Sequence, residues 1–164
     1  MGNPIRILAF MGLFMALVVI ATALLSIPVP TFNLYFNLGE SVIYIVALIY
    51  GAIPAAVIGG VGSALADLLK GYPAWAPITF FIKGIEGFIA GFFAKRYNPV
   101  TGLVLAAAFM MAGYATAAWK LYGPGAVPVE LAIDFLQVSA GAIIALLLHK
   151  RLKKLLLTED QDKF

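Results

Sequence analysis

The sequence predicts an all-α membrane protein: a bundle of six transmembrane helices with both termini in the cytoplasm. Of its 164 residues, 63% are hydrophobic and only 12% are charged, which is more apolar than a soluble domain of this size needs. The apolar runs are separated by short loops, and most approach the roughly 20 residues that a helix needs to cross a bilayer. We expect one transmembrane domain over residues 1–156 and a polar cytoplasmic tail over 157–164.

The first apolar run, residues 5–25, is expected to be a helix and not a cleaved signal, because it is long and further spans follow. Gly12 and Ala16 lie four residues apart within it. Two small residues at this spacing let a second helix approach closely in lipid, although such pairs also arise by chance in apolar helices.

Residues 26–40 are expected to form an extended loop, since Pro28 and Pro30 block a helix and polar residues alternate with apolar ones. The polar members are Asn33, Tyr35 and Asn37. This loop could cover a cavity as a lid or lie among the headgroups as an aromatic belt. Glu40 follows at the start of a second run, which ends near residue 50 and is short for a full span.

The third run, residues 54–69, carries Asp67 four residues after Ser63, so both are expected on one helix face. Asp67 then faces the bundle interior, or alternatively caps the following turn. In the next loop Trp75 is either a membrane-interface anchor or a stacking group for a flat ring.

The fourth run, residues 77–95, places Lys83 and Glu86 in its middle. Ionisable residues at membrane depth are costly, at roughly 2.5–3.5 kcal/mol on translocon scales, so they tend to face a bundle interior or a polar cavity. Their spacing of three allows them to meet on a helix. The pair either only fixes the helix orientation or borders a site for a polar solute. A neighbouring face carries glycines suited to close helix packing: Gly84, Gly87 and Gly91.

The fifth run, residues 100–119, includes Tyr114 and ends at Trp119. The sixth, residues 128–148, has the clearest pattern, because polar or small residues recur at intervals of four, three and four. These residues are Glu130, Asp134, Gln137 and Gly141. The stripe predicts a wet face towards the interior, with ordinary interfacial placement as the alternative.

The basic residues indicate the orientation. In a six-span layout most fall on one side, which the positive-inside rule places in the cytoplasm. The polar and aromatic groups then gather in the outer half and predict a cavity open to the outside. Its expected ligand-binding residues are Asn33, Tyr35, Asn37, Glu40, Asp67, Trp75, Lys83, Glu86, Tyr114, Trp119, Glu130, Asp134 and Gln137.

Several kinds of chemistry are not expected. The chain has no cysteine and one histidine, which argues against disulfides, thiol catalysis and a metal site. It has no phosphate-binding glycine loop of the GxxxxGK[ST] type. The basic cluster after the last run fits a membrane surface better than nucleic acid. We therefore expect no catalytic residues, and no metal or cofactor bound by this chain.

Two stretches, NLGESVIYIVALIYGAIPAAVIGGVGSALADLL and YPAWAPITFFIKGIEGFIAGF, resemble the substrate-binding S components of energy-coupling factor (ECF) vitamin transporters. The similarity is to the small riboflavin and hydroxymethylpyrimidine group. The resemblance implies a high-affinity binding subunit of a prokaryotic cell membrane that takes up a vitamin or precursor. It implies as partners a transmembrane coupling subunit and two ATPase subunits that use ATP. The coupling surface would be AxxxA in the first helix, which Gly12 and Ala16 match except at the first position.

The resemblance leaves the ligand open, and charge gives a direction. Five acids and three lysines are expected within the membrane or in its outer half. This excess of acids disfavours a strongly anionic ligand. A small neutral or weakly cationic aromatic ring fits better, such as hydroxymethylpyrimidine, a pyridoxine-like ring or riboflavin. The alternatives are a structural or regulatory membrane subunit without a ligand, or a membrane enzyme that uses Asp67, Lys83, Glu86 and Asp134.

Overall fold

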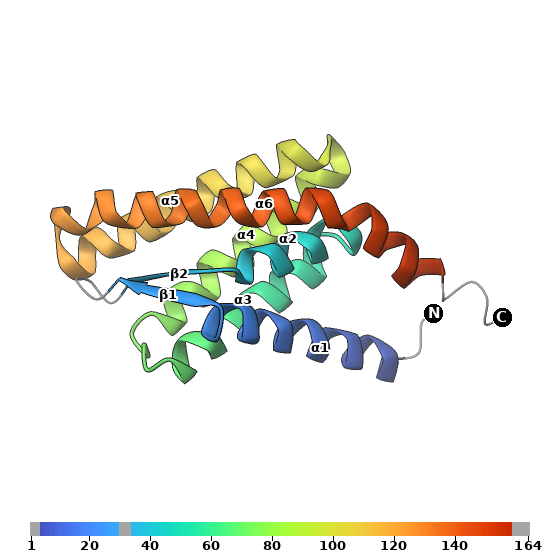
Figure 1. Cartoon of the computed structure of the whole chain (residues 1–164), viewed down its shortest axis with the longest axis horizontal. Coiled ribbons are helices and arrows are strands. Elements are labelled where there is room, and N and C mark those ends of the chain that lie inside the picture. Colours follow the sequence, from blue (N-terminus) through green and yellow to red (C-terminus); the bar gives the residue numbers. More distant parts are fainter. Residues whose placement is uncertain (1–3, 30–33, 159–164) are drawn as a thin grey trace.

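The computed structural model describes residues 4–29 and 34–158. Helices make up most of it, and a small antiparallel ribbon lies between the first two helices (Figure 1). In chain order the elements are α1 (Pro4–Ala23), β1 (Ser26–Val29), β2 (Leu34–Asn37), α2 (Gly39–Ile49), α3 (Ala52–Leu69), α4 (Ala76–Arg96), α5 (Pro99–Tyr122), the short 3₁₀ helix η2 (Pro124–Ala126) and α6 (Val127–Thr158).

All six expected helices are present, and their starts follow local sequence signals. The side chain of Asn98 caps α5 by accepting a hydrogen bond from the backbone N–H of Thr101 at 2.9 Å. Proline stands in the first turn of α4 and α5, where its missing N–H costs nothing. Gly51 adopts a φ of 94° between α2 and α3, a conformation that favours glycine and permits the tight turn.

The segment after α1 corrects one expectation, because it is a paired hairpin and not an open loop. Ser26 pairs with Asn37, and Val29 pairs with Leu34. The polar–apolar alternation that indicated an extended chain is the period of a β-strand. Pro28 is tolerated because a two-stranded ribbon consists of edge strands. The expected site residue Asn33 lies outside the described residues.

The expected glycine face of α4 packs against α3. A Cβ atom added at Gly87 would lie 2.5 Å from the carbonyl oxygen of Ala55, and one at Gly91 would lie 2.4 Å from the amide nitrogen of Ala52. These distances are too short for real atoms, so the two backbones touch directly. This close contact fixes α4, and with it the charged residues at its centre, against α3.

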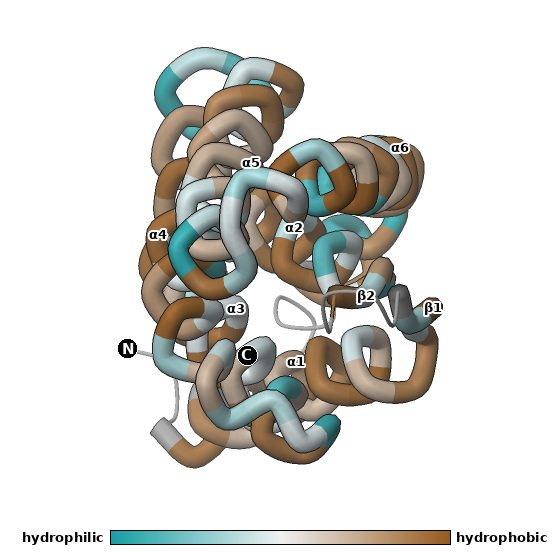
Figure 2. The backbone as a smooth tube through the Cα atoms, turned by 90° about the vertical axis from the view of Figure 1, so that its left-hand side faces the viewer, coloured by the Kyte–Doolittle hydropathy of each residue, from teal (hydrophilic) through white to brown (hydrophobic). Residues whose placement is uncertain are grey.

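The protein has four helices that are long and apolar enough to cross a membrane: α3, α4, α5 and the segment Pro124–Leu156. Seen end-on, α1, α3, α4, α5 and α6 surround the middle of the molecule, and the hairpin lies between α1 and α6 (Figure 2). Many large apolar side chains on the helices are exposed, including Leu8, Phe81 and Leu147. A multi-pass membrane protein follows from these features.

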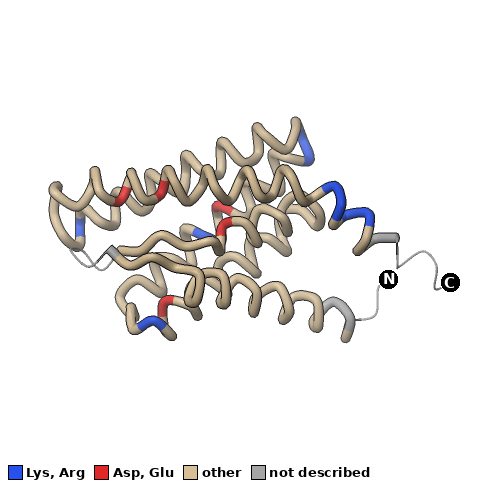
Figure 3. Tube along the Cα trace, viewed as in Figure 1, with Lys and Arg blue, Asp and Glu red and all other residues tan. Residues whose placement is uncertain are grey.

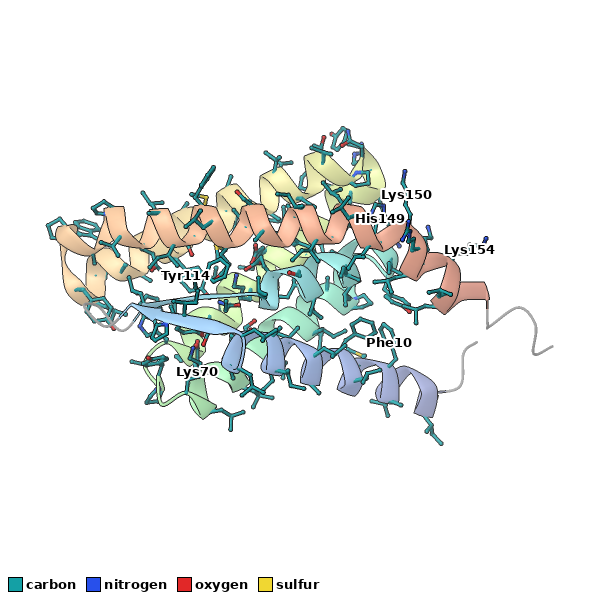
Figure 4. The ribbon with its side chains drawn as sticks, viewed as in Figure 1. Phe10, Lys70, Tyr114, His149, Lys150 and Lys154 are labelled. Atoms are coloured by element: carbon teal, nitrogen blue, oxygen red, sulfur yellow. The ribbon has the colours of Figure 1, made fainter. Side chains whose placement is uncertain are left out.

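Charged residues separate along the long axis. Most lysine and arginine residues gather at the end that carries both termini, while the acids and the other lysines lie near the middle and towards the hairpin end (Figure 3). Helix α6 continues past Leu148 to Thr158, so the basic cluster is helical and not part of a loop. His149, Lys150 and Lys154 lie at one end of the molecule, with Lys70 and Tyr114 towards the other (Figure 4).

Candidate functional site

A polar cavity opens between the hairpin and the helices. It holds about 510 Å³ of empty space, including the part open to solvent. Its lining residues come from all six helices, from β2 and from Trp75, which lies just before α4. The lining residues are Thr22, Leu34, Tyr35, Asn37, Gly39, Glu40, Ile43, Ser63, Asp67, Trp75, Thr79, Lys83, Tyr114, Glu130, Asp134 and Gln137.

Ten of the expected site residues line this cavity: Tyr35, Asn37, Glu40, Asp67, Trp75, Lys83, Tyr114, Glu130, Asp134 and Gln137. Two described residues do not. Glu86 is fully buried against Lys83, and Trp119 is 56% exposed at the end of α5. The stripe expected on α6 is buried along Glu130, Asp134 and Gln137.

Sequence reasoning missed six lining residues: Thr22, Leu34, Gly39, Ile43, Ser63 and Thr79. Isolated hydroxyl or apolar residues in an apolar helix carry little signal by themselves. Ser63 could have been found, because it stands four residues before Asp67 and shares its helix face.

Lys83 is the centre of a buried charge network. It forms ion pairs with Glu40 of α2 and, at 3.2 Å, with Glu86 one turn away on α4. The hydroxyl of Tyr44 donates to Glu86 at 2.8 Å. Two carboxyl groups thus surround one ammonium group in the protein interior, where their attraction to the ammonium offsets part of the cost of burying charge.

The network continues from Glu40 to the hairpin. Gln137 of α6 donates from Nε2 to Glu40 at 3.0 Å, and its Oε1 accepts from the Asn37 side chain at 2.7 Å. The Asn37 Oδ1 accepts in turn from the backbone N–H of Gly39 at 2.9 Å. Because these bonds join β2, α2 and α6, the position of the hairpin depends on the same buried charges.

A second set of contacts holds the hairpin to the end of α3. The Tyr35 hydroxyl donates to the Asp67 carboxylate, and Lys70 donates to Ser26 Oγ at 2.7 Å. The Lys70 ammonium also lies 3.3 Å from the centre of the Tyr35 ring, within range of a cation–π contact.

Aromatic rings also line the cavity. The rings of Trp75 and Tyr114 lie 5.9 Å apart, and Trp75 Nε1 donates to the Tyr122 hydroxyl at 3.0 Å. The Tyr114 hydroxyl donates to Thr79 Oγ1 at 3.1 Å. Acids and aromatic rings that line the same cavity suit a small flat polar ring. Among the described residues no cluster of histidine, cysteine and acid side chains could hold a metal ion.

We expect Tyr35→Phe to loosen the hairpin without unfolding the helices. The substitution removes the hydroxyl that bonds the Asp67 carboxylate, and bonds to charged groups contribute about 1.5–3 kcal/mol. Amide hydrogen exchange in residues 26–29 and 34–37 should accelerate by about tenfold or more. Tyr97→Phe, which changes a 62% exposed tyrosine, is the control. Unchanged exchange in Tyr35→Phe would show that the bond to Asp67 does not hold the hairpin.

Gly12 and Ala16 lie away from this cavity, on an exposed face of α1. A Cβ atom added at Gly12 would meet nothing within 4 Å. The inner face of α1 packs through Phe14 and Val18 instead. The expected pair of small residues is therefore accessible and does not serve packing within the described chain.

Comparison with known proteins finds a matching family and several similar proteins. The family model described as ECF-type riboflavin transporter, S component, matches residues 2–154. An uncharacterized protein of Pyrococcus woesei is 43% identical over 131 residues, which cover 77% of this chain and 88% of that protein. The thiamine precursor transporter HmpT of Lactococcus lactis is 27% identical over 93% of this chain and 91% of its own length. A UPF0397 protein of Streptococcus agalactiae is 34% identical over 57% of this chain and 51% of its own.

Proposed function

This chain belongs to the ECF-type riboflavin transporter S component family, and we propose that its polar cavity holds a small vitamin precursor ring during uptake. The protein is a substrate-binding subunit for vitamin uptake and not an enzyme. The observation that carries the cavity assignment is the meeting of acids, amides and aromatic rings from α2, α3, α5, α6, the hairpin and the segment before α4 around one cavity.

The charges around the cavity favour a hydroxymethylpyrimidine or pyridoxine-like ring. Among the described lining residues, the positive charge comes from Lys83. It already pairs with Glu40 and Glu86. Lys120 is exposed at the end of α5 and is not part of the lining. The excess of acids is therefore larger than the sequence alone indicates, and a strongly anionic ligand would meet repulsion. Riboflavin, which the family is named for, is the larger candidate.

We propose six membrane crossings with both termini in the cytoplasm. The basic end of the molecule carries both termini (Figure 3), as the positive-inside rule requires of a cytoplasmic face. At about 16 Å, the eleven-residue α2 covers half of the ~30 Å hydrocarbon core. The hairpin covers the remaining depth within the bundle, where its polar groups are shielded from lipid. The transmembrane domain then spans residues 1–156, with a short tail over 157–164.

The partners proposed are an ECF transmembrane coupling subunit and two ATPase subunits, in a prokaryotic cell membrane. The subunits that hydrolyse ATP are the partners, and this chain binds no cofactor of its own. The exposed small residues Gly12 and Ala16 give the coupling subunit a flat surface on α1. The cavity and this surface lie on different parts of the molecule, so binding and coupling can be tested separately.

The test of the proposal is to identify the ligand. The full chain is purified alone in mild detergent, and the small molecules that it releases are analysed by mass spectrometry and ultraviolet absorbance. We expect one vitamin-like aromatic compound at close to one per chain. Adding that compound at a hundred times its dissociation constant should stabilise the protein by about 2.7 kcal/mol.

Two variants test whether the compound is held in the cavity, one that changes the cavity and one that changes an exposed site as a control. Trp75→Ala removes an aromatic wall of the cavity and should lower the amount of compound retained. Phe81→Ala removes a 64% exposed ring from α4 and should not. An empty extract, together with no stabilisation by hydroxymethylpyrimidine, pyridoxine or riboflavin, would favour a structural or regulatory subunit instead.

A further inference from the structure

A second hollow opens at the end of α4, and it shares no lining residue with the polar cavity. It holds about 760 Å³ of empty space, including the part open to solvent. Its walls come from the connection between α2 and α3 and from the last turns of α4. Among the described residues that line it none is acidic, and two are basic, Lys95 and Arg96.

The two basic residues lie where the membrane surface meets the helix. Helix α4 has 21 residues, and at 1.5 Å per residue its length is ~31 Å. This length matches the hydrocarbon core of a bilayer, which is ~30 Å thick. Because α4 crosses that core from end to end, its last two residues, Lys95 and Arg96, emerge at the level of the lipid headgroups.

Neither basic side chain has a counter-charge in the part of the chain that the structure describes. The ion pairs recorded there belong to Lys83, and both Lys95 and Arg96 are exposed. The Lys95 side chain folds back over the connection between α2 and α3, since a Cβ atom added at Gly51 would lie 2.7 Å from Lys95 Nζ. Two cations therefore border one hollow, and a ligand can supply the missing negative charge.

The rest of the hollow is apolar and open towards lipid. Ile53 and Phe92, which both line it, are 65% and 45% exposed. The Phe92 ring stacks on that of Phe88, with 5.8 Å between the ring centres, and Phe88 is also exposed. Phe88 lies one turn nearer to the middle of α4, so an apolar strip leads from the basic residues into the hydrocarbon core. A molecule with an anionic head and an apolar chain matches this sequence of surfaces.

We propose that this hollow binds the headgroup of an anionic phospholipid. The phosphate pairs with Lys95 and Arg96, and an acyl chain follows Phe92 and Phe88 along α4. Basic pockets between transmembrane helices suit anionic headgroups, and a guanidinium can donate two parallel hydrogen bonds to a phosphate. A zwitterionic lipid carries its own cation, which the two basic side chains would repel. The lipid site is separate from the vitamin cavity, so its test is independent of the proposed function.

The experiment is native mass spectrometry of the full chain, stripped of lipid in a neutral detergent. Phosphatidylglycerol and phosphatidylcholine with identical acyl chains are added in equal amounts. We expect one phosphatidylglycerol per chain, bound at least about tenfold more tightly than phosphatidylcholine, because each basic residue near the membrane surface favours an anionic lipid. Equal binding of the two lipids by the wild type would overturn the proposal.

Two matched double variants test the assignment to these side chains. Lys95→Gln, Arg96→Gln removes both charges from the hollow and should abolish the preference for phosphatidylglycerol. Lys150→Gln, Arg151→Gln removes one lysine and one arginine from exposed positions of α6 outside the hollow and should keep the preference. All four side chains are exposed, so neither variant should unfold. An equal loss in both would indicate general attraction to a basic surface and would overturn the site.

The apolar part of the hollow distinguishes a lipid from free phosphate. Phe92→Ala should weaken phosphatidylglycerol binding by about threefold or more, because it removes apolar surface from the path of the acyl chain. Phe81→Ala, which removes a 64% exposed ring outside the hollow, should not. Millimolar inorganic phosphate should leave the lipid bound. Displacement by phosphate, with no effect of Phe92→Ala, would identify a site for free phosphate and overturn the lipid assignment.

Discussion

Replacing Lys83 with methionine is expected to lower the free energy of unfolding by about 3–5 kcal/mol, more than any substitution on the exposed helix faces. Lys83 is 4% exposed and pairs with both Glu40 and Glu86. Methionine fills much of the same volume, so the effect comes from charge and not from a cavity. Two buried carboxylates would be left side by side without a cation, which is costly in a low-dielectric interior.

The measurement is thermal and denaturant unfolding of the purified variants in detergent. The triple variant Glu40→Gln, Lys83→Met, Glu86→Gln should recover most of the loss, because no charge is then left unpaired. Lys120→Met, at an exposed lysine, is the matched control and should change stability by less than about 0.5 kcal/mol. A Lys83→Met protein as stable as the wild type would show that the network does not hold the bundle together.

The sequence predicted half of this network. Lys83 and Glu86 are three residues apart, and helical geometry alone brings them together. Glu40 is 43 residues from Lys83, and helical periodicity says nothing about which helices become neighbours. The glycines of α4 predicted a close helix contact, but not that α3 would be the partner, and the approach of α2 to α4 was not predictable either.

The hairpin shows the same limit at the level of secondary structure. The alternation around Tyr35 indicates an extended chain, but pairing needs a partner strand, and Ser26 to Val29 includes a proline. Nothing in such a short segment predicts that it pairs with β2. The helices were easier to place because long apolar runs in a membrane have few alternatives to a helix.

Trp119 shows that the type of a residue does not decide which face of a helix it occupies. In α5 the buried positions include Met110, Tyr114 and Ala118, which recur with the period of a helix. Trp119 follows Ala118 by one residue and so lies about 100° around the helix axis, outside this stripe. In an alanine-rich helix the buried and exposed faces look alike in sequence, so the side that Trp119 occupies could not be predicted. The stripe on α6 succeeded because its polar residues contrast with their apolar neighbours.

The largest expected effect on function is the loss of assembly when Gly12 is replaced by tryptophan. The protein is an S component, which we propose to act with a transmembrane coupling subunit. Gly12 and Ala16 lie on the exposed face of α1, and nothing approaches within 4 Å of a Cβ atom at Gly12. A tryptophan there can be accommodated within the chain, but it would hold a partner helix away from the backbone.

The Gly12→Trp variant should therefore lose assembly with the coupling subunit but keep ligand binding. We expect vitamin uptake in cells to fall to background and the coupling subunit to be lost on co-purification, while the affinity of the isolated chain for its ligand stays within about twofold. Val104→Trp, at a 60% exposed position of α5, places the same bulk on another lipid-facing helix and should transport normally. Because both tryptophans face outward, a defect confined to Gly12→Trp must arise from what touches α1. Normal assembly and uptake in that variant would place the coupling surface elsewhere on the bundle.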